Sequence, residues 1–523
     1  MKKITLIGLG AAMAMTAQAG GMLTNTNQNV AFNRMMSREA SIGIDGVYSN
    51  PAGVAFLPEG AHLSINWQAA FQSRTIKNEY APFAYNTSNP TAEREFKGKA
   101  SAPVIPSVQF AYNIKDWSFQ ANLAIGGGGG KCEFENGLGS FERIVANTAL
   151  AVNKLAAGID GASQQMAALG IKDPGLSKVF NSPAYSYESY MRGSQYFWNF
   201  SLAAAYKVNQ NLAVAAGLRG VLATANYYGY VKNITVSGMP LSMVIDKTKP
   251  NSANIELNCD QNGLGFTPYI GVDFKTGRFN FAAKYEFKTR MRLKNKSVNV
   301  APSIGNLPQV LAVDYGVELL NPNLVQKYEG TPYKEIVAGA QQTLLANMKQ
   351  FGETFDEGLE HSLGEYKDGT KIANDIPAYL ALGAGYKATD KLGVNVGFHY
   401  FFDKQATSYG NREKLLKRGT IELNAGVEYN ASKLVTLSAG WQNTSYGLTD
   451  AYMEDKSFVV GSNSVGLGAC FHASKKVDVN VAYFSTFYNH KKVTETDVNT
   501  GLEYKSDYTR ANNVLGVGID FHF

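Results

Sequence analysis

Long apolar runs are missing from this 523-residue sequence once its first residues are set aside. No later stretch approaches the roughly 20 apolar residues that a membrane-spanning helix needs. Charged residues make up only 18% of the chain, and the formal net charge of +6 is spread without a long basic run. This pattern disfavours a helical membrane protein and gives no sign of a nucleic-acid partner.

Cysteine is also scarce, with three residues in the whole chain. The odd number excludes a disulfide framework that uses all of them. Cys132 and Cys259 fall in segments expected to be outer loops, where one bridge between them is possible, whereas Cys470 is expected as a free thiol inside a strand. No pair has metal-ligand spacing, so we expect no zinc site and no other metal or cofactor.

The first 19 residues have the three parts of a secretory leader. Lys2 and Lys3 form a basic start, Ile4 to Ala14 is a short apolar core, and Ala17 to Ala19 fits the rule for a cleavage site. The apolar core is too short to anchor a membrane protein. We therefore expect a signal peptide over residues 1–19 and a mature chain outside the cytoplasm.

From Ala61 onward the sequence alternates between apolar and polar residues, and this pattern returns to the last residue. Side chains on a strand point to opposite faces in turn, so each alternating stretch predicts a strand with one apolar and one polar face. The polar face includes pairs such as Asn66 and Gln68, or Asn395 and His399. The stretches number about fourteen: 62–71, 107–112, 117–125, 197–206, 212–222, 266–274, 279–291, 376–386, 392–402, 421–429, 434–441, 465–471, 477–483 and 515–523.

The connections between these stretches switch between short turns and long loops, as in outer-membrane barrels. The strands that run into short turns also end in an outward-facing aromatic residue, which is expected at a membrane interface. These residues are Tyr112, Tyr206, Phe274, Tyr386, Tyr429 and Phe471, with Phe521 and Phe523 on the final strand. We therefore predict an all-β fold, a 14-stranded antiparallel transmembrane β-barrel over residues 61–523, which must close because an open edge in hydrocarbon is unstable.

Residues 20–60 do not alternate, and neither strand nor helix periodicity persists through them. A barrel of fourteen strands encloses more space than its own side chains fill, since about eight strands already do so. We predict that this segment is an N-terminal hatch, or plug, inside the barrel; the alternative is an unstructured leader.

Two long loops have a helical period and are predicted to form amphipathic helices on the outer side. These helices could form an apolar ligand groove over the barrel mouth, or each could simply pack on its own loop. The first stripe is Phe141, Val145, Thr148, Val152 and Leu155, and the second is Val337, Ala340, Leu344, Met348, Phe351, Phe355 and Leu359. The groove candidates are Val337, Leu344, Met348, Phe351 and Phe355.

The third strand ends in five consecutive glycines, Gly126, Gly127, Gly128, Gly129 and Gly130. Such a run weakens strand pairing and allows bends or bulges. It indicates either a flexible hinge into the loop or a break in the barrel wall.

The chain resembles the long-chain fatty acid outer-membrane transporters of the FadL/TodX type. The resemblance rests on the leader and on Ser37 to Gly53, in which Asn50, Pro51, Ala52 and Gly53 match the hatch signature. Stretches of several strands support it, including Phe279 to Met291, Ile376 to Phe398 and the closing NVLGVGIDFHF. It covers essentially the whole mature chain.

The resemblance implies passive uptake of hydrophobic molecules, most plainly long-chain fatty acids, by a monomer in the outer membrane of a Gram-negative bacterium, in contact with its lipid and lipopolysaccharide. Ligand would be captured in the outer groove, the hatch would move, and a kink in the third strand would allow lateral exit. Arg219, Lys284 and Arg290 point inward by parity as candidates for the ligand carboxylate. They could instead pair with Glu286, Asp273 or Glu428 as structural charges, which we favour.

Several other functions use the same barrel. Aromatic or other small apolar compounds would fit the same groove, and a non-selective porin or a surface adhesin would need no groove at all. An enzyme is disfavoured because no Gly-x-Ser-x-Gly motif is present and no serine aligns with His399, a histidine on a predicted inner face. The sequence therefore predicts a channel or transporter without catalytic residues.

Overall fold

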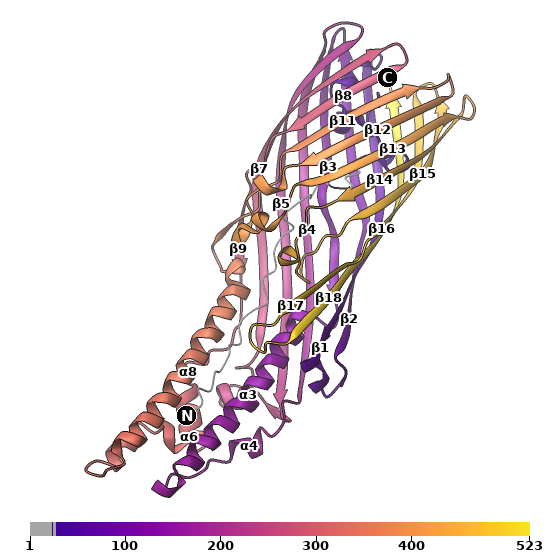
Figure 1. The fold of residues 1–523 in the computed structure, drawn as a ribbon. Helices are drawn as coiled ribbons and strands as arrows, with labels where there is room; N and C mark the ends of the chain where they lie inside the picture. The colour runs from indigo at the N-terminus through magenta and orange to yellow at the C-terminus, as the bar shows by residue number, and fades with distance from the viewer. Residues whose placement is uncertain (1–23, 25–27) are drawn as a thin grey trace.

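The computed structural model describes Thr24 and residues 28–523. The predicted signal peptide and most of residues 20–27 lie outside the described residues. The remaining chain forms one antiparallel sheet that closes on itself, because the first strand pairs with both the second and the last (Figure 1). The result is a closed barrel with 14 strands in its wall, as predicted.

The wall strands follow one another around the barrel in chain order. They are β1 (Gly60–Tyr80), β2 (Glu93–Ile114), β3 (Trp117–Phe134), β4 (Tyr185–Lys207), β5 (Leu212–Val236), β7 (Ile255–Thr276), β8 (Phe279–Glu286), β11 (Tyr379–Lys387), β12 (Leu392–Phe401), β13 (Thr420–Asn430), β14 (Val435–Ser445), β15 (Ser462–Ser474), β16 (Val477–Tyr488) and β18 (Glu503–His522). Four shorter strands extend the sheet among the long loops: β6 (Met239–Pro240), β9 (Arg292–Ser297), β10 (Lys371–Ala373) and β17 (Lys491–Thr496).

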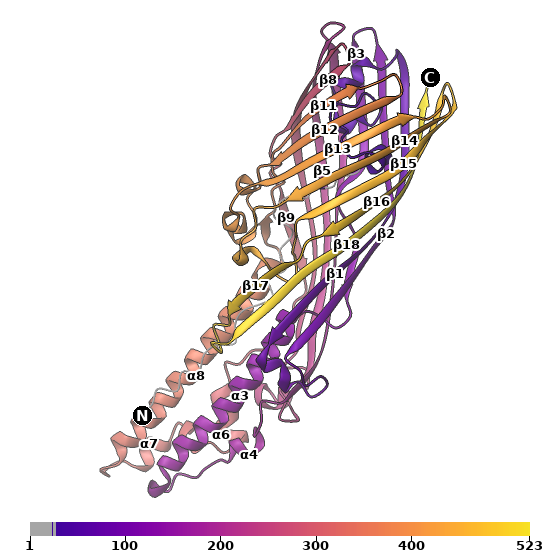
Figure 2. The ribbon, with the colours of Figure 1, turned by 45° about the vertical axis from the view of Figure 1, so that its right-hand side comes forward.

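Helices occur in the N-terminal segment and in the long loops. They are α1 (Val30–Arg34), α2 (Gly46–Ser49), α3 (Gly139–Gln165), α4 (Leu176–Val179), α5 (Ser242–Ile245), α6 (Leu307–Asp314), α7 (Leu324–Lys327) and α8 (Lys334–Leu363). The two predicted loop helices are confirmed as α3 and α8, which project together from the end of the barrel opposite the C-terminus (Figure 2). None of the helices in the described part of the chain is long and apolar enough to cross a membrane.

The two ends of the barrel differ, and we call them the short-turn rim and the long-loop rim. The alternation predicted from sequence separates the inner and outer faces: Asn66 and Gln68 are buried, whereas Ile65 and Trp67 on the same strand are exposed. The aromatic residues at the short-turn rim, from Tyr112 to Phe471, all face outward. The outer face is therefore an apolar band with an aromatic border, as a barrel in a lipid bilayer requires.

The seventh strand departs from the prediction. It was expected to run without interruption to Met291, but β8 ends at Glu286 and a single bridge, Thr289 with Ile376, holds the following residues. The alternation shifts by one residue there, so that Thr289 is buried and Arg290 is exposed. A one-residue slip exchanges the two faces of a strand. The prediction that Arg290 points into the lumen is therefore wrong.

The cysteines also differ from expectation, since all three are free thiols. Cys132 and Cys259 lie in strands β3 and β7 rather than in loops, and β4 and β5 stand between them. Three strand spacings amount to about 14 Å along the wall, far beyond the reach of a disulfide. The possible bridge between them is therefore excluded, while Cys470 is buried within β15 as predicted.

The described N-terminal segment, residues 28–59, lies inside the barrel against the inner face of its wall. Inward-facing glycines allow this close approach: a Cβ on Gly440 would lie 2.7 Å from the Met36 nitrogen, and one on Gly466 would lie 2.1 Å from the Asn33 oxygen. Helix α1 is held by side chains of the wall, including Asn66, which accepts a hydrogen bond from the Val30 nitrogen. The wall is thus shaped to fit this segment.

Candidate functional site: an outer cavity, a filled lumen and a gap in the wall

An apolar cavity lies among the loop helices above the long-loop rim, and we call it the outer cavity. It encloses about 730 Å³, including space open to solvent. Helices α3, α4, α5, α6 and α8 and strands β5 and β7 contribute its lining, and among the described lining residues Thr148 is the only one with a polar side chain. The Thr148 hydroxyl already donates to the Ile144 carbonyl at 2.7 Å. The outer cavity therefore offers an apolar surface with no free polar group among its lining side chains.

The two predicted helical stripes both contribute to this region, in different ways. Phe351 and Phe355 of α8 line the outer cavity, facing Val152 and Leu155 of α3. The other candidates on α8 are buried in the apolar core around the cavity without lining it: Val337, Leu344 and Met348. The stripes therefore both stabilise the loop region and form the cavity.

The motif Asn50–Gly53 anchors the N-terminal segment to the wall near the short-turn rim. The Asn50 amide donates to the Asp273 carboxylate on β7, and its Oδ1 accepts from the Gly53 nitrogen at 3.1 Å. A Cβ on Gly53 would lie 2.4 Å from the Asn50 amide nitrogen, so only glycine fits without a shift. The Pro51 carbonyl accepts from Gln120 at 2.7 Å. The two contacts to the wall, with Asp273 and Gln120, must break if this part of the segment moves.

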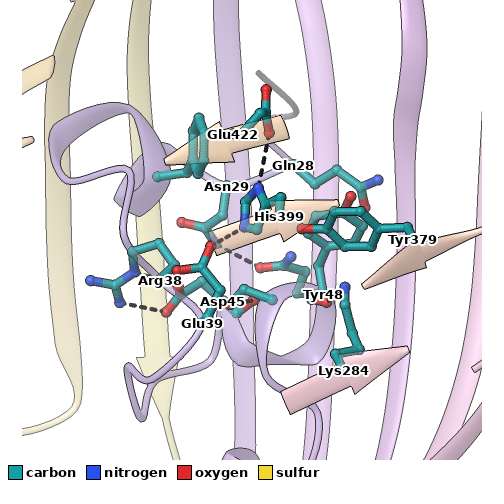
Figure 3. Close-up of a pocket in the computed structure, with 13 residues that line it drawn as sticks. Gln28, Asn29, Arg38, Glu39, Asp45, Tyr48, Lys284, Tyr379, His399 and Glu422 are labelled. Atoms are coloured by element: carbon teal, nitrogen blue, oxygen red, sulfur yellow. Dashed lines mark hydrogen bonds and ion pairs between the residues drawn. The ribbon is translucent and has the colours of Figure 1, made fainter. Parts of the chain in front are cut away.

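A second cavity, the lumen cavity, lies between the N-terminal segment and the wall and encloses about 490 Å³. Its lining is strongly polar, as Figure 3 shows. His399 of β12 contacts Glu39 of the segment at 2.5 Å and Glu422 of β13 at 2.9 Å. Arg38 and Asp45 form an ion pair at 2.7 Å within the segment. These charges have partners, so the lumen cavity is no ready-made site for an apolar ligand.

The lumen charges that the sequence indicated are also paired. Arg219 forms a buried ion pair with Glu286, and the Lys284 ammonium lies 3.0 Å from the other Glu286 oxygen. Lys284 also donates to the Tyr48 carbonyl at 2.6 Å. The structural interpretation favoured from sequence is therefore consistent with these contacts, although Asp273 binds Asn50 rather than a basic residue.

The third element is an interruption of the ladder between β2 and β3, which we call the wall gap. Pairing stops after Ser107 with Ala124 and resumes only at Ser101 with Lys131. The unpaired part of β3 contains the whole run Gly126–Gly130, in which Gly128 and Gly130 adopt φ values of 75° and 73°. Of the two alternatives for the glycine run, the structure shows a break in the pairing of the wall.

Two prolines on the other side of the wall gap were missed in the sequence. Pro103 and Pro106 lie in the unpaired part of β2. Proline has no backbone N–H to donate, so it is confined to strand edges and interruptions. Two prolines inside an otherwise continuous strand pattern were therefore a usable signal for the gap.

The inner side of the wall gap is apolar. Ala102 and Ile105 of the unpaired part of β2 pack with Met36 and Phe32 of the N-terminal segment and with Phe484 of β16. This cluster contrasts with the charged lumen cavity. An apolar molecule near the segment would find a compatible surface leading to the gap.

The polar partners of the N-terminal segment could not be found from the sequence. Glu39 and Glu422 contact the same histidine but lie 360 and 23 residues from it in the chain. Glu422 meets His399 through the register of β12 and β13, whereas Glu39 meets it because the segment lies inside the barrel. For His399, the sequence predicted only that the side chain points inward and did not indicate its partners.

Comparisons with known proteins show the fold. No protein-family model matches the sequence, and no curated protein matches it. The structure is similar to a crystal structure described as a Pseudomonas aeruginosa FadL homologue, with a TM-score of 0.57 and 13% identity over 98% of this chain and 100% of the other. It is also similar to a TodX monoaromatic hydrocarbon channel, deltaS2S3 mutant, with a TM-score of 0.50 and 14% identity over 95% and 99% of the two chains.

These similarities span the whole barrel together with its inner segment and loops. The chain has the fold of FadL-type barrels, which confirms the fold predicted from the alternating strands.

Proposed function

We propose that this protein is an outer-membrane channel for the passive uptake of hydrophobic molecules. The observation that carries the proposal is the outer cavity, whose described lining residues are apolar except for Thr148, and its hydroxyl is already hydrogen-bonded. Burying an apolar ligand there contributes roughly 0.8 kcal/mol per methylene. A wet, non-selective pore has no use for such a surface, and the segment inside the barrel also argues against an open pore.

Residues 28–59 serve as the hatch in this proposal, and the wall gap serves as the exit. Ligand leaves the outer cavity, the hatch shifts, and the ligand moves along the apolar cluster of Ala102 and Ile105 into the lipid. The polar lumen cavity is bypassed. The bacterium is Gram-negative, and the protein acts as a monomer surrounded by lipid and lipopolysaccharide.

Long-chain fatty acids are the first candidate substrates, and monoaromatic compounds are the second. The apolar lining favours both, because neither an acyl chain nor an aromatic ring needs a polar partner in the outer cavity. A fatty-acid carboxylate would have to remain outside the lining residues. Competition between labelled oleate and labelled toluene for uptake distinguishes the two substrates.

The test is uptake by cells with and without the protein, combined with a substitution that fills the wall gap. Ala102 is buried on the inner side of the gap, whereas Val104, in the same unpaired stretch, is 62% exposed on the outer side. We expect Ala102→Phe to reduce uptake to the level of cells that lack the protein and Val104→Phe to leave it unchanged. Full uptake by correctly folded Ala102→Phe protein would exclude the gap as the exit.

A single-channel recording separates this proposal from a porin. The purified protein should show no steady conductance while the hatch is in place. Large steady conductance in the absence of ligand would overturn the gated mechanism and favour a non-selective pore.

A further inference from the structure

The short-turn rim contains a cluster of metal-binding side chains that has no part in the proposed route. Cys470 and His472 lie two residues apart on β15, and Asp478 lies directly opposite His472 on β16. One potential ligand atom from each residue lies within 4.8 Å of the other two. Residues two apart on a strand share a face, so the hairpin directs all three side chains inward.

A fourth donor lies on the last strand. The His522 Nε2 is 3.3 Å from the second Asp478 oxygen, while the first Asp478 oxygen is 2.8 Å from the His472 Nδ1. The other His522 nitrogen lies 2.9 Å from the ring of His62 on β1. Three of the six histidines of the chain therefore gather within one hydrogen-bonded group at this rim.

We infer that Cys470, His472, Asp478 and His522 form a binding site for a single Zn²⁺ ion or a similar borderline transition metal. Thiolate, imidazole and carboxylate are the ligands that Zn²⁺ takes in proteins, usually four in a tetrahedral arrangement. Binding replaces the proton of the Cys470 thiol and the hydrogen bonds between the imidazoles and Asp478, so it releases at least one proton.

The surroundings of the cluster suit a metal ion that arrives from the aqueous side. The side chains of His472, Asp478 and His522 are partly exposed, at 36%, 22% and 32%, whereas Cys470 is buried behind them. Second-shell partners are also present: Thr436 contacts the His472 Nε2 at 3.0 Å, and His62 contacts His522. Such partners fix the orientation of ligand imidazoles.

The ligands come from three consecutive wall strands, β15, β16 and β18, and β18 pairs with β1 to close the barrel. These strands are neighbours once the sheet has formed, and the last of them carries the seam that closes the barrel. A metal bound here stabilises the closed state over the unfolded chain. The sequence analysis considered only cysteine pairs and therefore missed the mixed set of one cysteine, two histidines and one aspartate, and this inference departs from the expectation of a protein without metal.

The test uses the full-length mature protein, purified in detergent, stripped of metal with a chelator and titrated with Co²⁺. We expect one Co²⁺ per chain, an absorption band from thiolate-to-cobalt charge transfer, and loss of that band when Zn²⁺ is added. Cys470→Ser should abolish the band, and His472→Ala should weaken binding by at least about tenfold. Absence of the band in the folded wild-type protein, or its persistence in Cys470→Ser, would overturn the inference.

Matched controls use the same residue types elsewhere. Cys259→Ser removes a buried thiol on β7, and His490→Ala removes an exposed imidazole paired with Asp507; both should bind Co²⁺ as the wild type does.

A second measurement covers the case in which a Cys470 or His472 variant does not fold. In a Cys132→Ser/Cys259→Ser protein, Zn²⁺ should slow alkylation of Cys470, the remaining thiol. Equal alkylation rates with and without Zn²⁺ would show that the cluster only forms hydrogen bonds at the rim.

Discussion

The lumen and the loop region of this protein are held together by different kinds of contact, polar in the lumen and apolar in the loop region. The N-terminal segment inside the barrel is held by directional contacts, such as His399 with Glu39 and Asn50 with Asp273. The outer cavity is formed by non-directional apolar contacts between helices, with a single polar residue among its described lining residues. Directional contacts fix one position and can be exchanged one by one, whereas apolar contacts accept ligands of varied shape. In the mechanism proposed above, selectivity for apolar molecules therefore resides in the loop region and gating in the lumen.

The largest effect should come from the lumen. Arg219→Met leaves the buried Glu286 with Lys284 as its remaining ion-pair partner, and breaking a buried pair costs about 3–5 kcal/mol. We expect a loss near the lower end of that range in urea unfolding of the barrel in lipid vesicles. Arg290→Met is the matched control, because this exposed residue should change stability by less than about 0.5 kcal/mol. Equal losses in the two variants would remove the distinction between paired lumen charges and exposed ones.

An intermediate effect should come from the outer cavity. Phe351→Gln replaces an apolar lining residue. We expect the affinity for a fluorescent fatty-acid analogue to fall by about tenfold, because the loss of binding free energy should equal that of roughly two buried methylene groups. Leu345→Gln on the same helix is the control, since Leu345 is 40% exposed and does not line the cavity. The unfolding of the barrel should not change in either variant. If Arg219→Met weakened binding while Phe351→Gln did not, the roles of the two regions would be reversed.

The smallest effect concerns pH in the loop between β14 and β15. Burial lowers the pKa of Lys456 to about 8 from its ordinary 10.5, although the nearby Asp455, Glu454 and Glu365 raise it. Between pH 8 and 10.5 the unfolded loop binds more protons than the folded one, so the stability of the loop should rise with pH in this window. Limited proteolysis of residues 446–461 should therefore be slower at pH 10 than at pH 7.5.

The control for the pH experiment is Lys456→Met, which keeps the length of the side chain and removes the titrating group. Its cleavage should show only the pH dependence of the protease itself. A difference between pH values that persists in this variant would assign the effect to another group.

The sequence was a good guide where structure follows local periodicity. Alternation located every wall strand, and the three- to four-residue period of Phe141 or Val337 located α3 and α8, because both patterns depend on residues a few positions apart. It failed where periodicity breaks. Arg290 follows a one-residue shift of the alternation after β8, and no residue type near it indicates that shift in the sequence.

The candidate site shows the same division. The motif Asn50–Gly53 was found through the family resemblance, and the glycine run was visible because consecutive glycines weaken strand pairing. The contact of Glu39 with His399 depends on the segment lying inside the barrel, whereas the contact of Glu422 with His399 and the rim cluster at Cys470 depend on the exact register of neighbouring strands. Such contacts cannot be read from spacing in a single chain.

The position of α1 has a consequence for how the protein folds. Near the start of the chain, this helix contacts β14, β15, β16 and β18, which are among the last strands to be synthesised, as well as β1. The inward glycines leave its backbone almost no clearance from the wall. Contacts between the two ends of a long chain form slowly, because a large loop must close first. The residues that emerge early from the ribosome therefore reach their native positions only after the last wall strands have been synthesised.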